Sequence, residues 1–338
     1  MADDSVLAEL DPILAAAEPD APLWDTPGGE LEFVPTYDLL RQLLQSPIAQ
    51  GWAKKQQSGR VAKALDAWIA HELRRVGFHP DAVWPRAKEP RILPADVAPI
   101  EDAVDLALSR LDDLEARMMV NIAKALKQTN TTVLMPSTNH LRAAITNIRR
   151  TGKNRPLPGG SNAHILGRFY VKQVDVVVSS WQHGPDVLVS TKTQFSSYGN
   201  NKNNRYEEAV GEAKNLRDRH PMAAMGFAFL VRTNVYDEQG AFAYLRDLLV
   251  RLRKPDGDFD ATMLLAADWD NETQTVTDVK SATPLLSAER FFKDLVLAVT
   301  TNSPVDQHTA IRDLLPGPPP PGGLPSEDSA LVDDTAVE

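Results

Sequence analysis

Apolar residues recur at helical spacing through the first part of the chain. Between residues 61 and 76, large apolar side chains return every three or four positions, which predicts a helix that ends at Gly77. The same spacing predicts helices at 5–17 and 102–127, and proline-containing segments separate the predicted helices. We therefore expect a helical region over residues 1–135.

Beyond residue 135 the pattern changes to short runs of β-branched and aromatic residues. A predicted helix at 139–150 is followed by a strand-like run at 165–180, the turn sequence QHGPD and a second run at 187–195, which together predict a β-hairpin. A helix is expected at 203–219. The nearly continuous apolar run at 223–233 is typical of a strand that is covered on both faces.

The remaining pattern predicts a helix at 241–253, a strand at 262–267 and a helix at 287–300, and then a Pro/Gly-rich, acidic tail that we expect to be disordered. The fold class is therefore α+β or α/β, with a mixed sheet flanked by helices. The predicted parts are a helical region at 1–135, a sheet-containing domain at 136–301, and a tail at 302–338.

Composition narrows the function classes. The 338 residues include no cysteine, which excludes disulfides, zinc–thiolate sites and thiol nucleophiles. No apolar run reaches the roughly 20 residues that span a bilayer, and the acidic N-terminus does not resemble a secretory signal. No P-loop, no GxGxxG motif and no paired-histidine metal spacing occurs. We expect a cytoplasmic protein with no membrane partner.

The charge distribution is uneven. The net charge is −10, but residues 137–220 hold 13 basic and six acidic side chains. A polyanion responds to charge within a Debye length of roughly 8–10 Å rather than to the charge of the whole chain. This window is therefore compatible with a nucleic-acid partner, although a solvated basic surface explains it equally well.

Polar residues interrupt the Val-rich hairpin. If QHGPD forms the loop, Asp175 lies across from about Thr193 and beside Lys192. Alternation of side chains along a strand places Ser190 and Lys192 on one face. Asp and Lys are depleted in strands and are costly to bury unpaired, so they indicate either a site or a cross-strand ion pair on an exposed face.

The next predicted helix adds two carboxylates. Glu207 and Glu208 lie one turn into this helix, after the polar loop SSYGNNKNN. An Asp on one strand, a Lys on its partner and a Glu at the start of the next helix can converge at one end of a sheet. Carboxylates bind Mg²⁺, and an ammonium group stabilises developing negative charge and orients water. These are the groups that hydrolysis of a phosphodiester requires.

The stretch VDVVVSSWQHGPDVLVSTKTQ, followed by NRYEEAVGEAKNL, resembles the PD-(D/E)xK nuclease superfamily, to which many type II restriction enzymes belong. The resemblance covers roughly residues 163–233. It implies a restriction-endonuclease-like core, with Asp175 as the first metal ligand and Lys192 as the lysine of the motif.

The chain departs from this family at the second acid, where Ser190 stands in Ser190-Thr191-Lys192. One restriction-enzyme subgroup has the same substitution and supplies the carboxylate from the following helix. The resemblance therefore implies Glu207 or Glu208 as the second metal ligand. The catalytic set predicted in this way is Asp175, Ser190, Lys192 and Glu207, and the metal ligands are Asp175 with Glu207 or Glu208.

Two other acids compete for these roles. Pro185-Asp186 matches the first letters of the motif, but Pro-Asp is also a common turn dipeptide and lies in the predicted loop. Family members often carry a further acid on an upstream helix, and Glu115 is a candidate, although a solvent-facing helix residue is the simpler interpretation.

Several polar side chains are candidates for DNA contact. The loop residues Asn200, Asn203 and Asn204 have side chains that can pair with adenine, but Asn is also common in loops. The predicted phosphate and base contacts are Arg149, Arg150, Lys153, Arg155, Asn203 and Arg205.

The resemblance implies a Mg²⁺-dependent endonuclease that cleaves double-stranded DNA, as a restriction or DNA-defence enzyme. In such an enzyme we expect the helical region at 1–135 to contribute DNA contacts or dimerisation. Cleavage of both strands predicts a homodimer, because two sites must face opposite strands. The alternative is a catalytically inactive DNA-binding or scaffold protein with the same fold, and Ser190 at an acid position motivates it.

Overall fold

The computed structural model describes residues 2–17, 22–25, 32–53, 58–86, 163–180, 184–199, 202–253, 258–303 and 308–314. Several predicted features lie outside these ranges: the helices at 102–127 and 139–150, Glu115, Asn200, the basic residues Arg149, Arg150, Lys153 and Arg155, the boundary at residue 135, and the tail after residue 314. Among the described helices, none has the length and apolar character needed to cross a bilayer.

Helices and strands alternate through the second half of the described chain. The helices are α1 (Ala2–Ala15), α2 (Tyr37–Ala49), α3 (Ser58–Val76), α6 (Lys202–Arg217), α7 (Ala241–Leu252), α8 (Ala288–Asn302) and α9 (Thr309–Leu314), with short 3-10 turns η2 (Thr233–Tyr236) and η3 (Pro284–Leu286). The strands are β1 (Trp24–Asp25), β2 (Glu32–Phe33), β3 (Val83–Trp84), β4 (Ala163–Leu166), β5 (Val171–Val174), β6 (Val176–Ser180), β7 (Gly184–Gln194), β8 (Ala224–Arg232), β9 (Ala261–Trp269) and β10 (Val276–Ser281).

A six-stranded mixed sheet forms the centre of the fold, in the order β10-β9-β8-β7-β6-β3. Strands β7, β8 and β9 are parallel, and the outer pairs are antiparallel. The central strand β8 is the apolar run predicted at 223–233, and it is buried along all but its last residue. The prediction of an α+β chain with a mixed sheet flanked by helices is confirmed.

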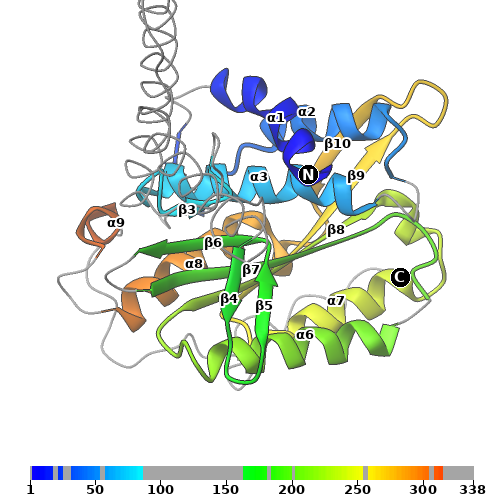
Figure 1. Ribbon diagram of the computed structural model, residues 1–338. Helices are drawn as coiled ribbons and strands as arrows, with labels where there is room; N and C mark the ends of the chain where they lie inside the picture. The colour runs from blue at the N-terminus through cyan, green and yellow to red at the C-terminus, as the bar shows by residue number, and fades with distance from the viewer. Residues whose placement is uncertain are drawn as a thin grey trace, which may run out of the picture.

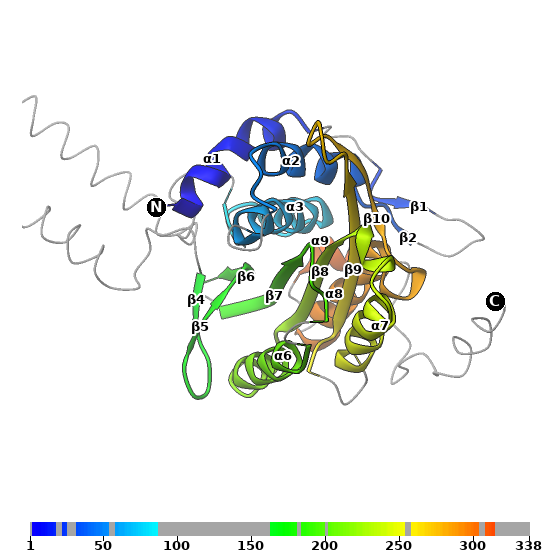
Figure 2. The same ribbon diagram turned by 90° about the vertical axis from the view of Figure 1, so that its right-hand side faces the viewer.

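Helices cover both faces of the sheet. Figures 1 and 2 show α3 on one side of the sheet and α6 on the other. Alternate residues along the strands belong to different apolar clusters: Val189 packs in the cluster that contains α1, α2, α3 and α8, and Leu188 packs in the cluster that contains α6 and α7. The N-terminal helices and the sheet therefore share a hydrophobic core.

The predicted hairpin exists, but the predicted register was wrong by three residues. Val176 pairs with Val189, which places Asp175 at the level of Ser190 instead of Thr193. The turn is tighter than QHGPD because Gly184 already pairs with Ser180, and a register shift follows Val178. The first strand-like run is also divided, since β4 and β5 form a separate two-stranded hairpin before the chain bends at Asp175 into β6.

Candidate active site

Strand β7 positions the candidate site because its side chains alternate between the two helical layers. Thr191 lies on the same face as Val189 and points toward α3, whereas Ser190 and Lys192 point toward α6. Ser190 and Thr191 are both buried. Neighbouring residues of one strand therefore serve two separate polar clusters.

Asp175 lies where β6 leaves β7. The pairing of β6 with β7 ends at Val176 and Val189, and the Oδ2 atom of Asp175 then accepts a hydrogen bond from the Thr191 amide at 2.9 Å. The carboxylate thus replaces the carbonyl that a continuing strand would present. This contact fixes Asp175 beside the backbone between Ser190 and Lys192.

Lys192 lies against two glutamates of α6. Its Nζ atom is 3.2 Å from Oε1 of Glu208 and 4.0 Å from Oε1 of Glu212. Lys172 of β5 forms a further ion pair with Glu212, which is buried. Two ammonium groups and two carboxylates therefore share one cluster on the α6 side of the sheet, which we call the α6-side cluster.

The two glutamates of the α6-side cluster have opposite pKa shifts. Burial raises the pKa of Glu212 above its ordinary value, and the charges of Lys192 and Lys172 oppose this effect without cancelling it. Burial is also the largest single effect on Glu208, but Lys192, a hydrogen bond with Glu212 and the charge of Lys172 together outweigh it and lower the pKa of Glu208. Glu208 is therefore the more readily ionised carboxylate of the pair.

A second cluster lies on the α3 side. Oδ1 of Asp66 accepts a hydrogen bond from the Thr191 hydroxyl at 2.6 Å, and Oδ2 accepts one from Lys63 Nζ at 3.0 Å. Burial raises the pKa of Asp66 to about 6; Lys63 counteracts the shift, and repulsion from the Asp175 carboxylate adds to it. Asp66 and Asp175 therefore interact electrostatically on either side of Thr191.

The sequence analysis did not identify Asp66. The sequence does contain an indication of this ion pair. Lys63 and Asp66 are three residues apart within the apolar pattern of the 61–76 helix, where charged residues are unfavourable unless they are paired. Glu212 was also missed. It lies one turn after Glu208 on the same helix, and its burial and its contacts with Lys172 and Lys192, which local sequence does not show, distinguish it from a solvated residue.

The structure brings some of the predicted residues together and separates others. Lys192 and Glu208 meet on the α6 side of β7, and Glu207 is exposed next to Glu208 in the sequence. Asp175 is anchored to the same stretch of β7 through the Thr191 amide, but its carboxylate acts on Asp66 of the α3-side cluster. The competing Asp186 lies six residues before Lys192 on the same strand, a distance of about 20 Å, and its carboxylate is 3.5 Å from His308. Asn203 and Arg205 lie in the first turns of α6, and their side chains are outside the described part of the structure.

The donor chemistry of the site fits a hard cation. Asp175 and Glu208 offer carboxylate oxygens, which Mg²⁺ prefers to nitrogen or sulfur donors. Within the described ranges, however, no three acidic or histidine side chains are already grouped to hold a metal. Glu208 is instead paired with Lys192, so metal binding at this place requires the ammonium group to give up that contact.

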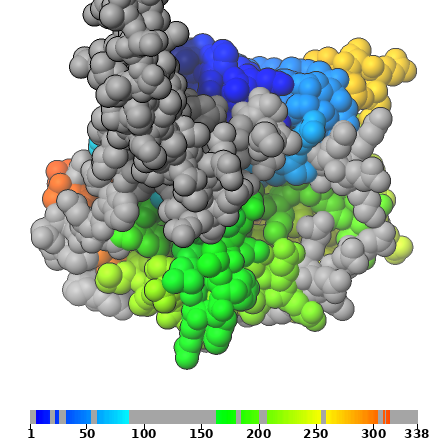
Figure 3. Space-filling model, viewed as in Figure 1, coloured from blue at the N-terminus to red at the C-terminus, as the bar shows by residue number. Residues whose placement is uncertain are grey.

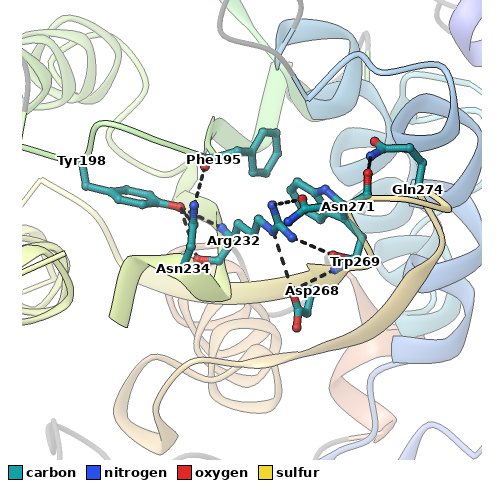
Figure 4. A network of polar contacts seen from close by, with 8 residues as sticks. All are labelled: Phe195, Tyr198, Arg232, Asn234, Asp268, Trp269, Asn271 and Gln274. Atoms are coloured by element: carbon teal, nitrogen blue, oxygen red, sulfur yellow. Dashed lines mark hydrogen bonds and ion pairs between the residues drawn. The ribbon is translucent and has the colours of Figure 1, made fainter. Parts of the chain in front are cut away.

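A further polar network lies at the carboxyl ends of β7, β8 and β9 (Figure 4). Arg232 stacks over the Trp269 ring at 4.4 Å, and it donates to the Trp269 carbonyl at 2.7 Å and to Asn271 at 2.8 Å. On the β7 side, the Tyr198 hydroxyl donates to Asn234 at 2.6 Å. These contacts fix the loops that follow β7 and β9, and the guanidinium group is already used by protein partners.

No protein-family model, no curated protein and no solved structure matches this chain. The geometry of the site and the charges around it are therefore the basis for a functional interpretation.

Proposed function

We propose that this chain is a Mg²⁺-dependent endonuclease that cleaves double-stranded DNA, with a core of the restriction-endonuclease type and a role in defence against foreign DNA. The supporting observation is that Asp175 bonds to the Thr191 amide, and that Lys192, the next residue of β7, pairs with Glu208 of α6. These residues come from a strand junction, a central strand and the following helix, which is the arrangement that the PD-(D/E)xK resemblance implies.

The carboxylates of Asp175 and Glu208 are the proposed metal ligands. They would hold the ion, and the chemistry it would supply there is polarisation of a phosphate oxygen and a lower pKa for a bound water molecule. Glu208 is preferred to Glu207 because it already contacts Lys192 and has a lowered pKa, so it is ionised at neutral pH. Glu212 serves as the alternative partner of Lys192 when Glu208 turns to the metal.

Lys192 is the proposed catalytic cation. Its ammonium group lies between β7 and α6 with about a quarter of the side chain exposed, so it can reach a phosphate without leaving the site. There it orients a water molecule and stabilises negative charge on the phosphate oxygens. Ser190 lines the site beside it, and Asp66 is a positioning residue because it acts through Thr191.

Plasmid cleavage tests this proposal. We expect supercoiled plasmid to be cut in Mg²⁺ and to remain intact in EDTA. Asp175→Asn, Lys192→Ala and Glu208→Gln should each reduce the cleavage rate by about 100-fold or more, the usual effect of removing one electrostatic stabiliser. Lys280→Ala is the matched control, because Lys280 forms an exposed ion pair with Asp278 at 2.7 Å on β10. Equal losses in Lys280→Ala and Lys192→Ala would contradict a catalytic role for Lys192.

The assignment of the helix carboxylate has its own test. If Glu207→Gln abolishes cleavage and Glu208→Gln does not, the activity stands and the second ligand is Glu207. If the wild-type protein cuts both strands, light scattering should show a dimer, because two sites must face opposite strands. A monomer that makes double-strand breaks in a single binding event would contradict the homodimer.

A non-catalytic DNA-binding or scaffold protein is the second candidate. Two observations favour it: Ser190 stands where the motif has an acid, and Lys192 is already neutralised by Glu208 and Glu212. In that case the purified protein binds DNA equally well in Mg²⁺ and in EDTA and cuts it in neither. The same plasmid experiment therefore separates the two candidates.

A further inference from the structure

Exposed large apolar side chains gather on one hairpin. Among the described residues, six large apolar side chains are exposed, and four of them lie between residues 166 and 171 at the tip of β4 and β5: Leu166, Phe169, Tyr170 and Val171. Phe169 is the most exposed of all, at 70%. Figure 3 shows this green hairpin protruding beyond the lower edge of the molecule. Apolar groups gathered in this way on a surface indicate a binding site.

The tip is held in one conformation by α6. The side chain of Asn215 is almost completely buried, and its Oδ1 atom accepts hydrogen bonds from the amides of Phe169 at 2.8 Å and Tyr170 at 3.3 Å. Its Nδ2 atom donates to the Tyr170 carbonyl at 3.0 Å. Gly167 permits this close approach, because a Cβ atom there would overlap the Asn215 amide. An aromatic tip that is already ordered loses little entropy when it binds.

Basic side chains surround the aromatic tip. Arg168 and Lys214 are each about 60% exposed, and Arg219 is exposed close by on the chain after α6. Two acids oppose them. Asp218 is largely covered by Lys214 at 2.9 Å and Arg168 at 3.1 Å, and Asp258 is half-buried. The surface at the tip is therefore positive, as a polyanionic partner requires, whereas the core of a protein–protein interface is typically depleted of charge.

The tip is close to the candidate active site. Asn215 follows Glu208 by seven residues on α6, which corresponds to about 10 Å along the helix axis. This distance is about three base pairs of a DNA duplex. Lys172, on the same hairpin, contacts Glu212 in the α6-side cluster. A duplex lying over Lys192 would therefore also meet the hairpin.

We propose that the tip of the β4–β5 hairpin is a DNA wedge, in which the ring of Phe169 enters a base step of the duplex while Arg168 and Lys214 bind the flanking phosphates. The inference rests on the proposed function in taking DNA as the partner. Apolar side chains inserted between base pairs unstack and kink DNA, and a fixed hairpin with one dominant exposed ring suits this role. The wedge would distort the duplex a few base pairs from the scissile phosphate.

Binding and DNA topology test the wedge. The full-length Lys192→Ala protein, which leaves the hairpin unchanged, is titrated in EDTA into a fluorescein-labelled pool of random-sequence duplexes at low salt. The same protein is then added while a metal-independent topoisomerase relaxes a closed plasmid, so that unwinding by the wedge is recorded as a change in linking number. Phe169→Ala and Phe169→Trp are added in this background. Tyr236→Ala is the control, because Tyr236 is another exposed aromatic residue, on η2.

We expect Phe169→Ala to bind about tenfold more weakly, the loss typical of one aromatic–base stack, and to abolish the change in linking number. Phe169→Trp should keep both effects, and Tyr236→Ala should match the parent. Unchanged affinity and unwinding in Phe169→Ala would overturn the inference. So would a change from dimer to monomer in Phe169→Ala, because it would identify the tip as a contact between copies of this chain.

The failure of the wedge and the failure of the nuclease proposal give different results. If the wild-type protein cleaves plasmid, and Phe169→Ala changes neither the cleavage rate nor the DNA affinity, the nuclease proposal stands and the wedge proposal fails. If the protein unwinds DNA through Phe169 but never cleaves it, the wedge proposal stands and the nuclease proposal fails. If the protein binds no DNA at low salt, both proposals fail.

Discussion

Replacing Asn215 by alanine should destabilise the protein and release the β4–β5 hairpin. The side chain makes three hydrogen bonds with the hairpin backbone, two as acceptor and one as donor. Each is worth about 1 kcal/mol net, so the loss in the free energy of unfolding should be about 2–3 kcal/mol. Asn215→Asp keeps both acceptors, but it replaces the donor with a carboxylate oxygen that faces the Tyr170 carbonyl and buries a charge, so it should cost at least as much.

Urea denaturation, followed by circular dichroism, measures the free energy of unfolding, and hydrogen exchange measures the local effect. The amides of Phe169 and Tyr170 should exchange about tenfold faster in Asn215→Ala for each 1.4 kcal/mol of lost protection. Asn271→Ala is the control, because this exposed amide bonds only to Arg232 among the contacts described, and its loss should cost about 0.5 kcal/mol. If Asn215→Ala matches the wild type in both measurements, the hairpin is not fixed by α6.

Three further outcomes follow from the structure. Burial raises the pKa of Asp66 from 3.8 to about 6, so between these pH values the folded protein retains a proton that the unfolded chain releases, and the stabilising contribution of this residue is full below about pH 4 and is lost as the pH rises through about 6. In urea titrations, the difference in unfolding free energy between wild type and Asp66→Asn should therefore fall by about 3 kcal/mol over this interval. A difference that rises or stays constant would refute the shift. Gly226→Ala should cost about 1–3 kcal/mol, because the added Cβ would lie 2.9 Å from Phe291 Cζ in the core, and a melting temperature equal to that of the wild type would show that the ring moves aside freely. Chelation by EDTA should leave the melting temperature unchanged, because Lys172 and Lys192 already compensate the charge of the glutamates in the α6-side cluster. A marked fall in the melting temperature would instead indicate a structural metal.

The sequence predicted the elements in which apolar residues repeat at a regular spacing or form a continuous run. The helices α3, α6, α7 and α8 and the strands β8 and β9 lie close to their expected ranges. The helices repeat apolar residues at helical spacing, and the two strands are nearly continuous apolar runs. Helix α2 and strand β10 were not predicted. Helix α2 contains Pro47 near its end, and β10 has only six residues, of which Val276 and Val279 are the buried ones, so no period-two pattern marks it.

The candidate site was predicted less completely than the fold, because it depends on contacts that are distant in sequence. Residues 190–192 and Asp175 were identified, but their register was wrong, since composition alone does not show that Ser180 already pairs with Gly184. Asp66 is 125 residues from Thr191, and local spacing does not indicate which strand faces that part of α3. The choice between Glu207 and Glu208 depended on the rotation of α6 about its own axis.

The sharing of a hydrophobic core between α1–α3 and the sheet has a consequence for how the protein can be divided. Val176, Val178 and Val189 lie against the same apolar cluster as Leu65 and the other buried residues of α3. A recombinant fragment that begins after residue 135 would leave this valine-rich surface in contact with water and would also lack β3 at the sheet edge. Such a fragment should be recovered as aggregates, and co-expression with the separate N-terminal piece should return it to solution.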